Sequence, residues 1–226
     1  MHEKPSAAGR PWAKETGRRV PDVVRMRITG GIYRSRALRA PHGQATRPTS
    51  DRVREALFGS LGSRNAVAEA RVLDLYAGTG ALAIEALSRG AAHATLVESS
   101  REALSVLRAN LTSLGLERQT QVVAADVGRM AGRLARQGPF DLVLADPPWA
   151  LVDSGEAPEA IAGIVGEGVL APRALLVLEH SARTKPPSIP GLVLDEQRRY
   201  GDTALAIYKP AILAPPRPPQ AGTGSE

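Results

Sequence analysis

The 226-residue sequence contains no cysteine, which excludes disulfides, thiolate nucleophiles and cysteine-based metal sites. It also lacks an apolar run of the roughly 18 residues that a membrane-spanning helix requires. The first 30 residues are polar and rich in arginine, without the apolar core of a secretory signal. The four histidines show no spacing typical of a metal site or a catalytic triad. We therefore expect a cytoplasmic protein with no membrane segment and no metal.

Positive charge is concentrated at the amino-terminal end of the chain. Residues 1–50 contain 11 lysines and arginines against 3 acidic residues, whereas the remaining residues contain 18 against 20. A basic front end on a nearly neutral body is typical of a protein that binds a polyanion. A solubilising tail would have the same composition, so both interpretations stay open at this point.

Apolar segments with the periods of strands and helices alternate along residues 71–179. This alternation predicts a doubly wound α/β fold, in which helices cover both faces of a mostly parallel sheet. Gly201 and Asp202 separate two further apolar segments, which predicts an antiparallel hairpin at the end of a seven-stranded sheet. The expected strands span residues 71–75, 93–98, 120–124, 140–145, 174–179, 192–200 and 204–208, and the expected helices span residues 80–89, 100–114, 127–137 and 157–167.

The chain is organised around residues 72–80, VLDLYAGTG, where a short apolar strand runs into a glycine turn. Gly78 and Gly80 let the backbone approach a ligand closely, and the helix that follows offers free N–H groups at its start. Doubly wound sheets bind nucleotide-like cofactors at such turns. The spacing also matches the loose dinucleotide pattern G-x-G-x-x-A. However, the carboxylate of Asp74 would repel a pyrophosphate and suits a cationic ligand such as S-adenosylmethionine.

A second candidate site, Asp146-Pro147-Pro148-Trp149, follows the strand expected at residues 140–145. The Asp146 carboxylate and the Pro147 carbonyl can accept hydrogen bonds from an exocyclic NH2 group and free its lone pair for attack. The prolines stiffen the loop, and Trp149 offers a flat face on which an extruded base can stack. The same four residues could form only a strand-ending turn. Their position beyond an acid-containing glycine turn favours methylation of an amine.

Arginines flank a predicted hairpin near the amino terminus, with strands at residues 23–29 and 32–38 and a turn at Gly30-Gly31. Arg25 and Arg27, like Arg34 and Arg36, are two residues apart, so each pair is expected on one face of its strand. With Tyr33 nearby, such a ribbon suits phosphates and a stacked base. A solvated edge ribbon with protective charges is the alternative. Next along the chain, Thr49 or Ser50 is expected to cap a helix whose buried stripe contains Val53, Ala56, Leu57 and Leu61.

Residues 27–31 (RITGG), 47–58 (RPTSDRVREALF) and 77–82 (AGTGAL), together with the Asp-Pro-Pro-Trp tetrapeptide, closely resemble the bacterial 16S ribosomal RNA guanine-N2 methyltransferases, the RsmD family. The resemblance extends over roughly residues 25–208, and its most specific part is the segment that begins at Arg47. It implies a Rossmann-like class I methyltransferase that transfers a methyl group from S-adenosylmethionine to N2 of a guanine. It also implies a partner, ribosomal RNA, either free or in a small-subunit assembly particle. We further expect a monomer. The family usually has Phe or Tyr at the position of Trp149.

Residue chemistry and the resemblance together predict three sets of site residues. By the resemblance, Glu98 holds the ribose hydroxyls and Asp126 the adenine amino group, although either acid could instead cap a helix. Arg47, Arg52 and Arg54 are implied to face the cofactor mouth or the RNA. The catalytic set is Asp146, Pro147, Pro148 and Trp149; the cofactor-binding set is Asp74, Tyr76, Gly78, Gly80, Glu98 and Asp126; the RNA-binding set is Arg25, Arg27, Tyr33, Arg34, Arg36, Arg47, Arg52 and Arg54.

We expect a disordered basic tail over residues 1–22 and an RNA-contacting hairpin and helix over residues 23–64. A methyltransferase domain over residues 65–209 and a disordered proline-rich tail over residues 210–226 complete the expected organisation. Three other functions fit parts of this pattern: an adenine-N6 methyltransferase acting on DNA or RNA, a dinucleotide-dependent oxidoreductase, and a non-catalytic RNA-binding module.

Overall fold

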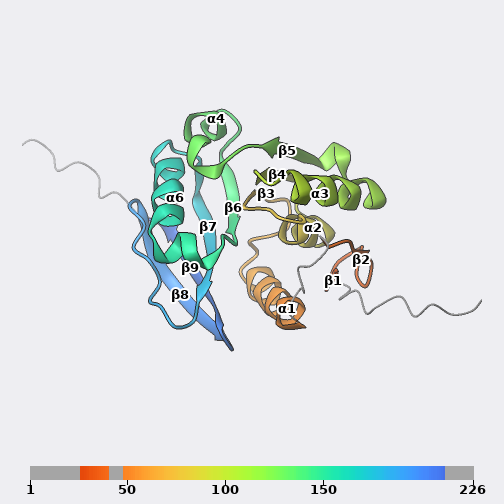
Figure 1. The fold of residues 1–226 in the computed structure, drawn as a ribbon, viewed down its shortest axis with the longest axis horizontal. Coiled ribbons are helices and arrows are strands. Elements are labelled where there is room, and N and C mark those ends of the chain that lie inside the picture. The colour runs from red at the N-terminus through yellow and green to blue at the C-terminus, as the bar shows by residue number, and fades with distance from the viewer. Residues whose placement is uncertain (1–25, 41–47, 212–226) are drawn as a thin grey trace, which may run out of the picture.

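The structure is a computed structural model that describes residues 26–40 and 48–211. Its centre is a seven-stranded sheet with the order β5-β4-β3-β6-β7-β9-β8 (Figure 1). Pairs from β5 to β7 are parallel, and β9 is antiparallel to both of its neighbours, which confirms the predicted doubly wound class and its terminal hairpin. The strands are β3 (Arg71–Leu75), β4 (His93–Glu98), β5 (Thr120–Ala124), β6 (Phe140–Ala145), β7 (Leu170–Ser181), β8 (Leu192–Tyr200) and β9 (Thr203–Pro210).

Helices cover both faces of this sheet and bury a separate apolar core on each side. Buried side chains of α1, α2 and α3 form the core on one face, and those of η2, α4 and α6 form the core on the other. In the part of the chain that the structure describes, no helix is long and apolar enough to cross a membrane. The helices are α1 (Pro48–Ser63), α2 (Ala81–Ser88), α3 (Arg101–Leu114), α4 (Ala131–Ala135), α5 (Trp149–Asp153) and α6 (Glu156–Gly166), with 3₁₀ turns η1 (Glu117–Gln119) and η2 (Val127–Arg129).

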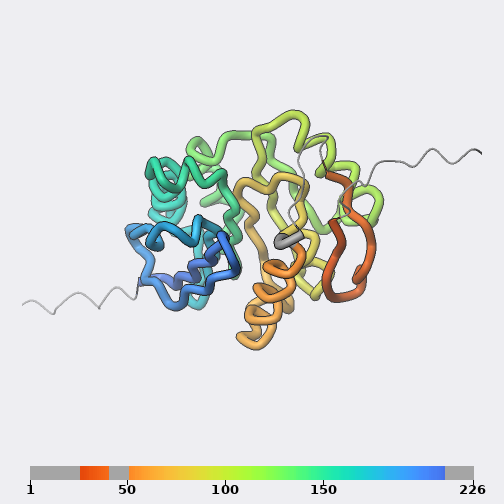
Figure 2. The backbone as a smooth tube through the Cα atoms, turned by 60° about the horizontal axis from the view of Figure 1, so that its bottom comes forward, coloured from red at the N-terminus to blue at the C-terminus, as the bar shows by residue number. Residues whose placement is uncertain are grey.

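Helix α1 packs largely as its amphipathic pattern predicts, although Ala56 of the expected stripe is only half-buried. Val53, Leu57 and Leu61 are buried, and Phe58, which the sequence reading did not include, is also fully buried. Arg52 and Glu55 lie on the exposed side. The helix begins at Pro48, one residue before the expected cap positions, because proline is well suited to the first helical turn. Figure 2 shows α1 between the amino-terminal loop and the carboxy-terminal strands, which lie at opposite ends of the molecule.

The amino-terminal hairpin differs from the prediction. Its strands, β1 (Met26–Arg27) and β2 (Ala37–Leu38), contain two residues each, and residues 28–36 form a loop. The loop is held by the end of α2: the Ile32 N–H donates to the Ser88 carbonyl over 2.8 Å, and the Tyr33 N–H donates to Ser88 Oγ over 2.9 Å. Within the described residues, the two sides of the hairpin are joined further only at Ile28, which bonds to Ser35 and Arg36, and residues 31–35 form a turn. The prediction that Arg34 and Arg36 share one face of a strand is therefore wrong.

Smaller differences concern the ends of elements. The helix expected at residues 127–137 is divided into η2 and α4, because Gly128 and Gly132 lower its helix propensity. Strand β7 begins at Leu170, earlier than expected, since its first residues pair with Phe140. Residues 1–25, 41–47 and 212–226 lie outside the described chain, so the two tails and the domain boundaries stay predictions.

Candidate active site

A cavity of about 760 Å³ opens at the carboxyl ends of β3, β4, β6 and β7, where doubly wound sheets bind their ligands. The glycine turn after β3 borders one side, and the Asp-Pro-Pro-Trp loop after β6 borders the middle. Both sequence motifs therefore face the same space. Of the predicted cofactor-binding and catalytic residues, the cavity is lined by Tyr76, Gly78, Glu98, Asp126, Asp146, Pro147, Pro148 and Trp149.

The glycine turn has an unusual backbone that the sequence pattern permits. Tyr76, Gly78 and Gly80 all have positive φ angles, of 59°, 54° and 79°. For Tyr76 this left-handed conformation is costly, and such strain is common in ligand-binding loops. The Ala77 N–H donates to the Val97 carbonyl over 3.0 Å, which ties the turn to β4. The turn is thus held open by its neighbours rather than by its own side chains.

Asp74 and Gly80 support the turn from behind and do not border the cavity. Asp74 is buried, and its Oδ2 accepts the Ala83 N–H of α2 over 3.0 Å, whereas its Oδ1 has no hydrogen-bond partner among the described residues. Burial raises the pKa of Asp74 to about 8, with smaller contributions from the charges of Asp146 and Glu98. A side chain at Gly80 would press on Leu96 and Leu107. Direct cofactor contact by these two residues stays a prediction.

Glu98 closes β4 and binds the turn through its carboxylate. Oε2 accepts the Gly78 N–H over 2.8 Å, and Oε1 accepts the N–H groups of Ser99 and Ser100 over 2.8 and 2.7 Å. A carboxylate has about four lone-pair sites, so it can still accept hydroxyl groups. Ser100, not Glu98, caps α3 with its side chain. Asp126 does act as a cap, because it accepts the Gly128 N–H over 3.0 Å, and it borders the cavity as well.

The Asp-Pro-Pro-Trp loop leaves the end of β6 and leads into the short helix α5, whose first residue is Trp149. Asp146 is accessible from the cavity, yet the surrounding protein limits its hydration and raises its pKa to about 6. Such an acid is ionised at pH 7 to 8 but holds a proton more readily than a surface aspartate. Perturbed carboxylates of this kind gather at functional sites.

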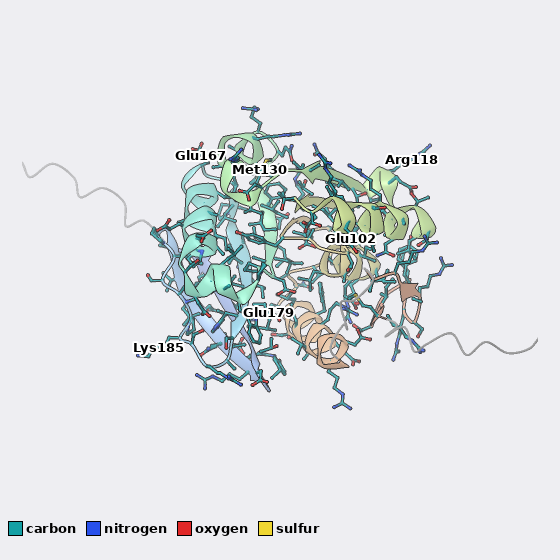
Figure 3. The ribbon with its side chains drawn as sticks, viewed as in Figure 1. Glu102, Arg118, Met130, Glu167, Glu179 and Lys185 are labelled. Atoms are coloured by element: carbon teal, nitrogen blue, oxygen red, sulfur yellow. The ribbon has the colours of Figure 1, made fainter. Side chains whose placement is uncertain are left out.

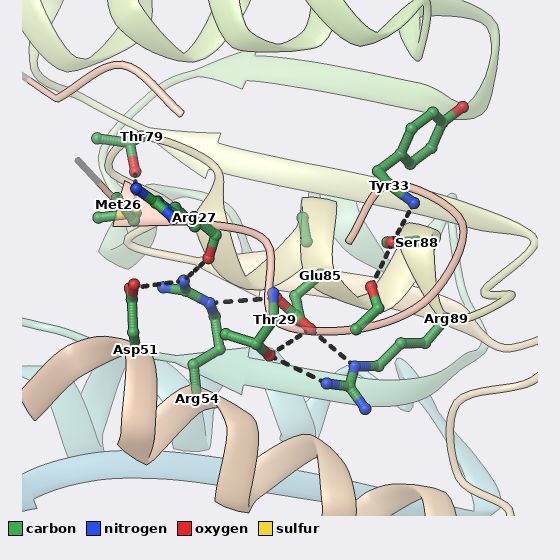
Figure 4. Close-up of polar contacts among 12 residues, drawn as sticks. Met26, Arg27, Thr29, Tyr33, Asp51, Arg54, Thr79, Glu85, Ser88 and Arg89 are labelled. Atoms are coloured by element: carbon green, nitrogen blue, oxygen red, sulfur yellow. Dashed lines mark hydrogen bonds and ion pairs between the residues drawn. The ribbon is translucent and has the colours of Figure 1, made fainter. Parts of the chain in front are cut away.

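The amino-terminal segment supplies another wall of the cavity, from Met26, Val53, Arg54 and Leu57. Arg54 was predicted to face the cofactor mouth or the RNA, and the structure shows that it lines the cavity. Only 4% of its side chain is exposed, because its guanidinium donates to Asp51, to Glu85 and to the Arg27 carbonyl (Figure 4). Arg54 is therefore buried in this network and does not lie on an open surface that could face RNA.

Glu85 is the centre of that network, although sequence reasoning assigned it no role. It is fully buried and accepts the Thr29 N–H over 2.8 Å, the Thr29 hydroxyl over 2.7 Å and Arg89 Nε over 2.8 Å (Figure 4). A buried carboxylate needs such partners, because its desolvation is expensive. The network joins α1, α2 and the amino-terminal loop. The sequence feature that could have indicated this role is a glutamate on the otherwise apolar face of a predicted helix.

The remaining RNA-binding candidates that the structure describes do not line the cavity. Arg27, Arg34, Arg36 and Arg52 are exposed. Tyr33 is half-buried, and the Arg36 guanidinium lies 5.9 Å from the centre of its ring. Arg25 and Arg47 are outside the described residues. RNA contact by all of these residues stays a prediction.

The far end of the cavity contains residues that sequence reasoning missed. Val177 and Glu179 come from β7, and Thr203 and Leu205 come from β9. Glu179 is the single acidic side chain in an otherwise mostly apolar predicted strand, and this feature could have identified it as a site residue. Across residues 26–40 and 48–211, no group of three or more histidine, aspartate or glutamate side chains could hold a metal ion.

A sheet of this order, with a glycine turn after β3 and an Asp-Pro-Pro-Trp loop after β6 facing one cavity, defines a Rossmann-like class I methyltransferase. Comparison with known sequences agrees. The family model described as conserved hypothetical protein 95 matches residues 26–209. The Escherichia coli K12 protein named ribosomal RNA small subunit methyltransferase D is 37% identical over 186 residues, which cover 81% of this chain and 89% of that protein. The Haemophilus influenzae protein of the same name is 32% identical, with coverages of 81% and 93%.

Solved structures give the same result. The structure of yhhF from Escherichia coli has a TM-score of 0.70 and 37% identity, covering 82% of this chain and 98% of that one. A hypothetical protein from Thermus thermophilus has a TM-score of 0.69 and 33% identity, with coverages of 81% and 99%. The chain belongs to the conserved hypothetical protein 95 family, which confirms the resemblance to the RsmD family and the enzyme class, a methyltransferase.

Proposed function

We propose that this protein transfers a methyl group from S-adenosylmethionine to N2 of a guanine in small-subunit ribosomal RNA. The observation that carries this proposal is the single cavity into which the glycine turn and the Asp-Pro-Pro-Trp loop both open. Family membership and the names of the curated relatives support ribosomal RNA as the substrate. We propose that it acts in the cytoplasm, where such a substrate is assembled, and that it acts as a monomer.

The residues around the glycine turn fit this cofactor. Oδ1 of Asp74 is a buried acceptor without a partner among the described residues, and Asp74 lies on β3 just before the turn. Glu98 retains acceptor capacity for ribose hydroxyls, and Asp126 borders the same cavity. When bound, S-adenosylmethionine supplies an electrophilic methyl group, and its sulfur keeps the electron pair of the broken bond.

The chain's own residues prepare the nucleophile. Asp146 and the Pro147 carbonyl accept hydrogen bonds from the target NH2 group, which biases the nitrogen away from the conjugated planar form and makes its lone pair available. The new N–C bond leaves a positive charge on the nitrogen, and the nitrogen then loses a proton. Asp146, whose pKa is about 6, is suited to stabilise that charge and to receive the proton. Trp149 provides a stacking surface for the base.

The experiment that tests this function compares small-subunit ribosomal RNA from cells with and without the gene. We expect one N2-methylguanosine to be absent without the gene, as measured by mass spectrometry of nucleosides and of nuclease fragments. The purified protein with S-adenosylmethionine should restore it on subunits from the deletion strain. N6-methyladenosine in its place would show the alternative, an adenine-N6 methyltransferase, and restoration of neither base would refute both.

The form of the substrate is tested in the same assay. Naked RNA and a partly assembled small subunit are both open as substrates, and the comparison of initial rates on particles and on naked RNA of the same sequence distinguishes them. An equal rate on naked RNA would assign recognition to the RNA alone.

A further inference from the structure

The cavity extends well beyond the part that a cofactor at the glycine turn would occupy. In the sheet order, β7 and β9 lie on the far side of β6 from β3 and β4. Their contribution to the cavity wall is Val177, Glu179, Thr203 and Leu205, and α1 adds Val53, Arg54 and Leu57. The guanidinium of Arg54 is paired with Asp51 and Glu85, so the acceptor that this end offers is the carboxylate of Glu179 on β7, among mostly apolar neighbours. A compartment of this composition is suited to a base whose edge carries a hydrogen-bond donor.

The strand register places that carboxylate next to Asp146. Ala145 of β6 pairs with Leu178 of β7, so the residues that follow, Asp146 and Glu179, continue two adjacent strands that lie about 4.8 Å apart. Side chains alternate along a strand, and Glu179 therefore points to the same face as Val177, which lines the cavity. Figure 3 shows Glu179 on the α1 side of the sheet.

Two adjacent carboxylates match the edge of guanine better than that of adenine. Guanine carries donors on two neighbouring atoms, the N2 amino group and the N1–H. Adenine has an acceptor at N1. An ionised carboxylate can only accept hydrogen bonds. It therefore forms a hydrogen bond with the N1–H of guanine and repels the N1 lone pair of adenine. A site that hydrogen-bonds a polar group of its substrate discriminates against analogues that lack this group by large factors in kcat/KM.

We propose that Glu179 reads the guanine, accepting a hydrogen bond from N1–H while Asp146 and the Pro147 carbonyl hold the N2 amino group. This inference rests on the proposed function and adds to it the residue that selects the base. The apolar neighbours Val177, Leu205 and Leu57 limit water around the pair, which strengthens a hydrogen bond to the carboxylate. Glu179 is a specificity residue in this scheme, and the methyl transfer itself depends on Asp146.

The test compares guanine with 2-aminopurine at the target position. 2-Aminopurine keeps the amino group on C2 but has a bare acceptor at N1. Both bases are placed at the mapped position of 16S RNA by ligation of a synthetic segment, followed by reconstitution of small subunits. We expect the wild-type enzyme to prefer guanine by about 10- to 100-fold in kcat/KM, which is the effect of one hydrogen bond to a charged group.

Two variants then separate recognition from structure. Glu179→Ala should lower kcat/KM on guanine about 10- to 100-fold. It should not lower the rate on 2-aminopurine and should raise it somewhat, because the repulsion between the carboxylate and the N1 lone pair is removed. Glu179→Gln keeps the side-chain shape, and its amide N–H can donate to N1 of 2-aminopurine, so it should raise the rate on that base. The affinity for S-adenosylhomocysteine should stay within about twofold of wild type in both variants. The control is Glu159→Gln on α6, an exposed acid across the sheet, which should change neither rate.

The outcomes distinguish the inference from the proposed function. If the wild-type enzyme methylates guanine and Glu179→Gln keeps the wild-type preference for guanine over 2-aminopurine, Glu179 does not read the base and the inference is refuted alone. If the wild-type enzyme methylates neither base on these particles, the proposed function is refuted, and the inference that rests on it is refuted with it. A lower preference in Glu179→Gln, with unchanged cofactor affinity and melting temperature, supports the inference even if Glu179→Ala folds poorly.

Discussion

The two ends of the cavity are built in different ways. At the glycine turn, the wall is formed by short segments at the ends of β3, β4 and β5, and the Glu98 carboxylate joins two of them by accepting the N–H groups of Gly78, Ser99 and Ser100. At the far end, the wall is made of side chains from α1, β7 and β9, which are distant in sequence. The first end is encoded by a local motif, whereas the second exists only once the sheet and α1 have packed together.

This difference predicts that substitutions at the two ends have separable effects. Changes near the glycine turn should weaken cofactor binding, and changes near β6 and β7 should affect turnover and choice of base. Changes in the buried network around Glu85 should lower the stability of the folded protein, on which both ends of the cavity depend.

The largest effect is expected for Asp146→Ala. This change removes an acceptor that acts mainly in the transition state, so kcat should fall about 100- to 1000-fold. The dissociation constant of S-adenosylhomocysteine should change by less than about threefold, because ground-state cofactor contacts remain. Steady-state methylation of small subunits and isothermal titration measure the two quantities. Equal loss of cofactor binding and turnover would place Asp146 at the cofactor end.

The next effect concerns stability. Glu85→Ala leaves the buried Arg54 with Asp51 as its remaining carboxylate partner and removes the acceptor for Thr29, so the free energy of unfolding should fall by about 3 kcal/mol. Urea unfolding followed by circular dichroism measures this change. Glu85→Gln, which keeps the shape and one acceptor oxygen, should lose less. An unfolding free energy close to wild type in both variants would show that the network does not stabilise the amino-terminal segment.

A smaller effect, on cofactor binding alone, is expected for Glu98→Ala. Losing hydrogen bonds to a charged group should weaken S-adenosylhomocysteine binding by about 1–3 kcal/mol. Isothermal titration gives the value, and Glu117→Ala, at an exposed acid of η1, is the matched control. Unchanged affinity would leave Glu98 with a purely structural role in holding the turn.

The smallest effect is expected outside the cavity, at Arg34 and Arg36. Replacing both with alanine should weaken RNA binding and lower the slope of log affinity against log salt by about 1–2, because fewer counterions are released. Filter binding across a salt series measures the slope. Arg133→Ala with Arg136→Ala, a pair at α4 on another part of the molecule, is the control. An unaltered slope in the first variant, or an equal change in the control, would argue against a phosphate contact by the amino-terminal loop.

Periodicity predicted most of the fold, because each strand and helix of the parallel sheet buries a face that its own residues specify. The expected ranges at β3, β4, β5 and β6 are the observed ones. The amino-terminal hairpin was predicted poorly, since the conformation of residues 28–36 is set by Glu85 and Ser88 of α2. Local alternation of residues cannot report bonds to a helix so distant along the chain.

The same distinction holds for the site. The sequence by itself determined the two motifs that face the cavity, because a glycine turn and an Asp-Pro-Pro loop constrain their own backbone. Only the tertiary structure decided that Asp74 and Gly80 lie behind the turn, that Arg54 is buried, and that Glu179 continues the strand beside Asp146. Those positions depend on which elements pack together and in what register, and the register is fixed by the buried faces of the whole sheet.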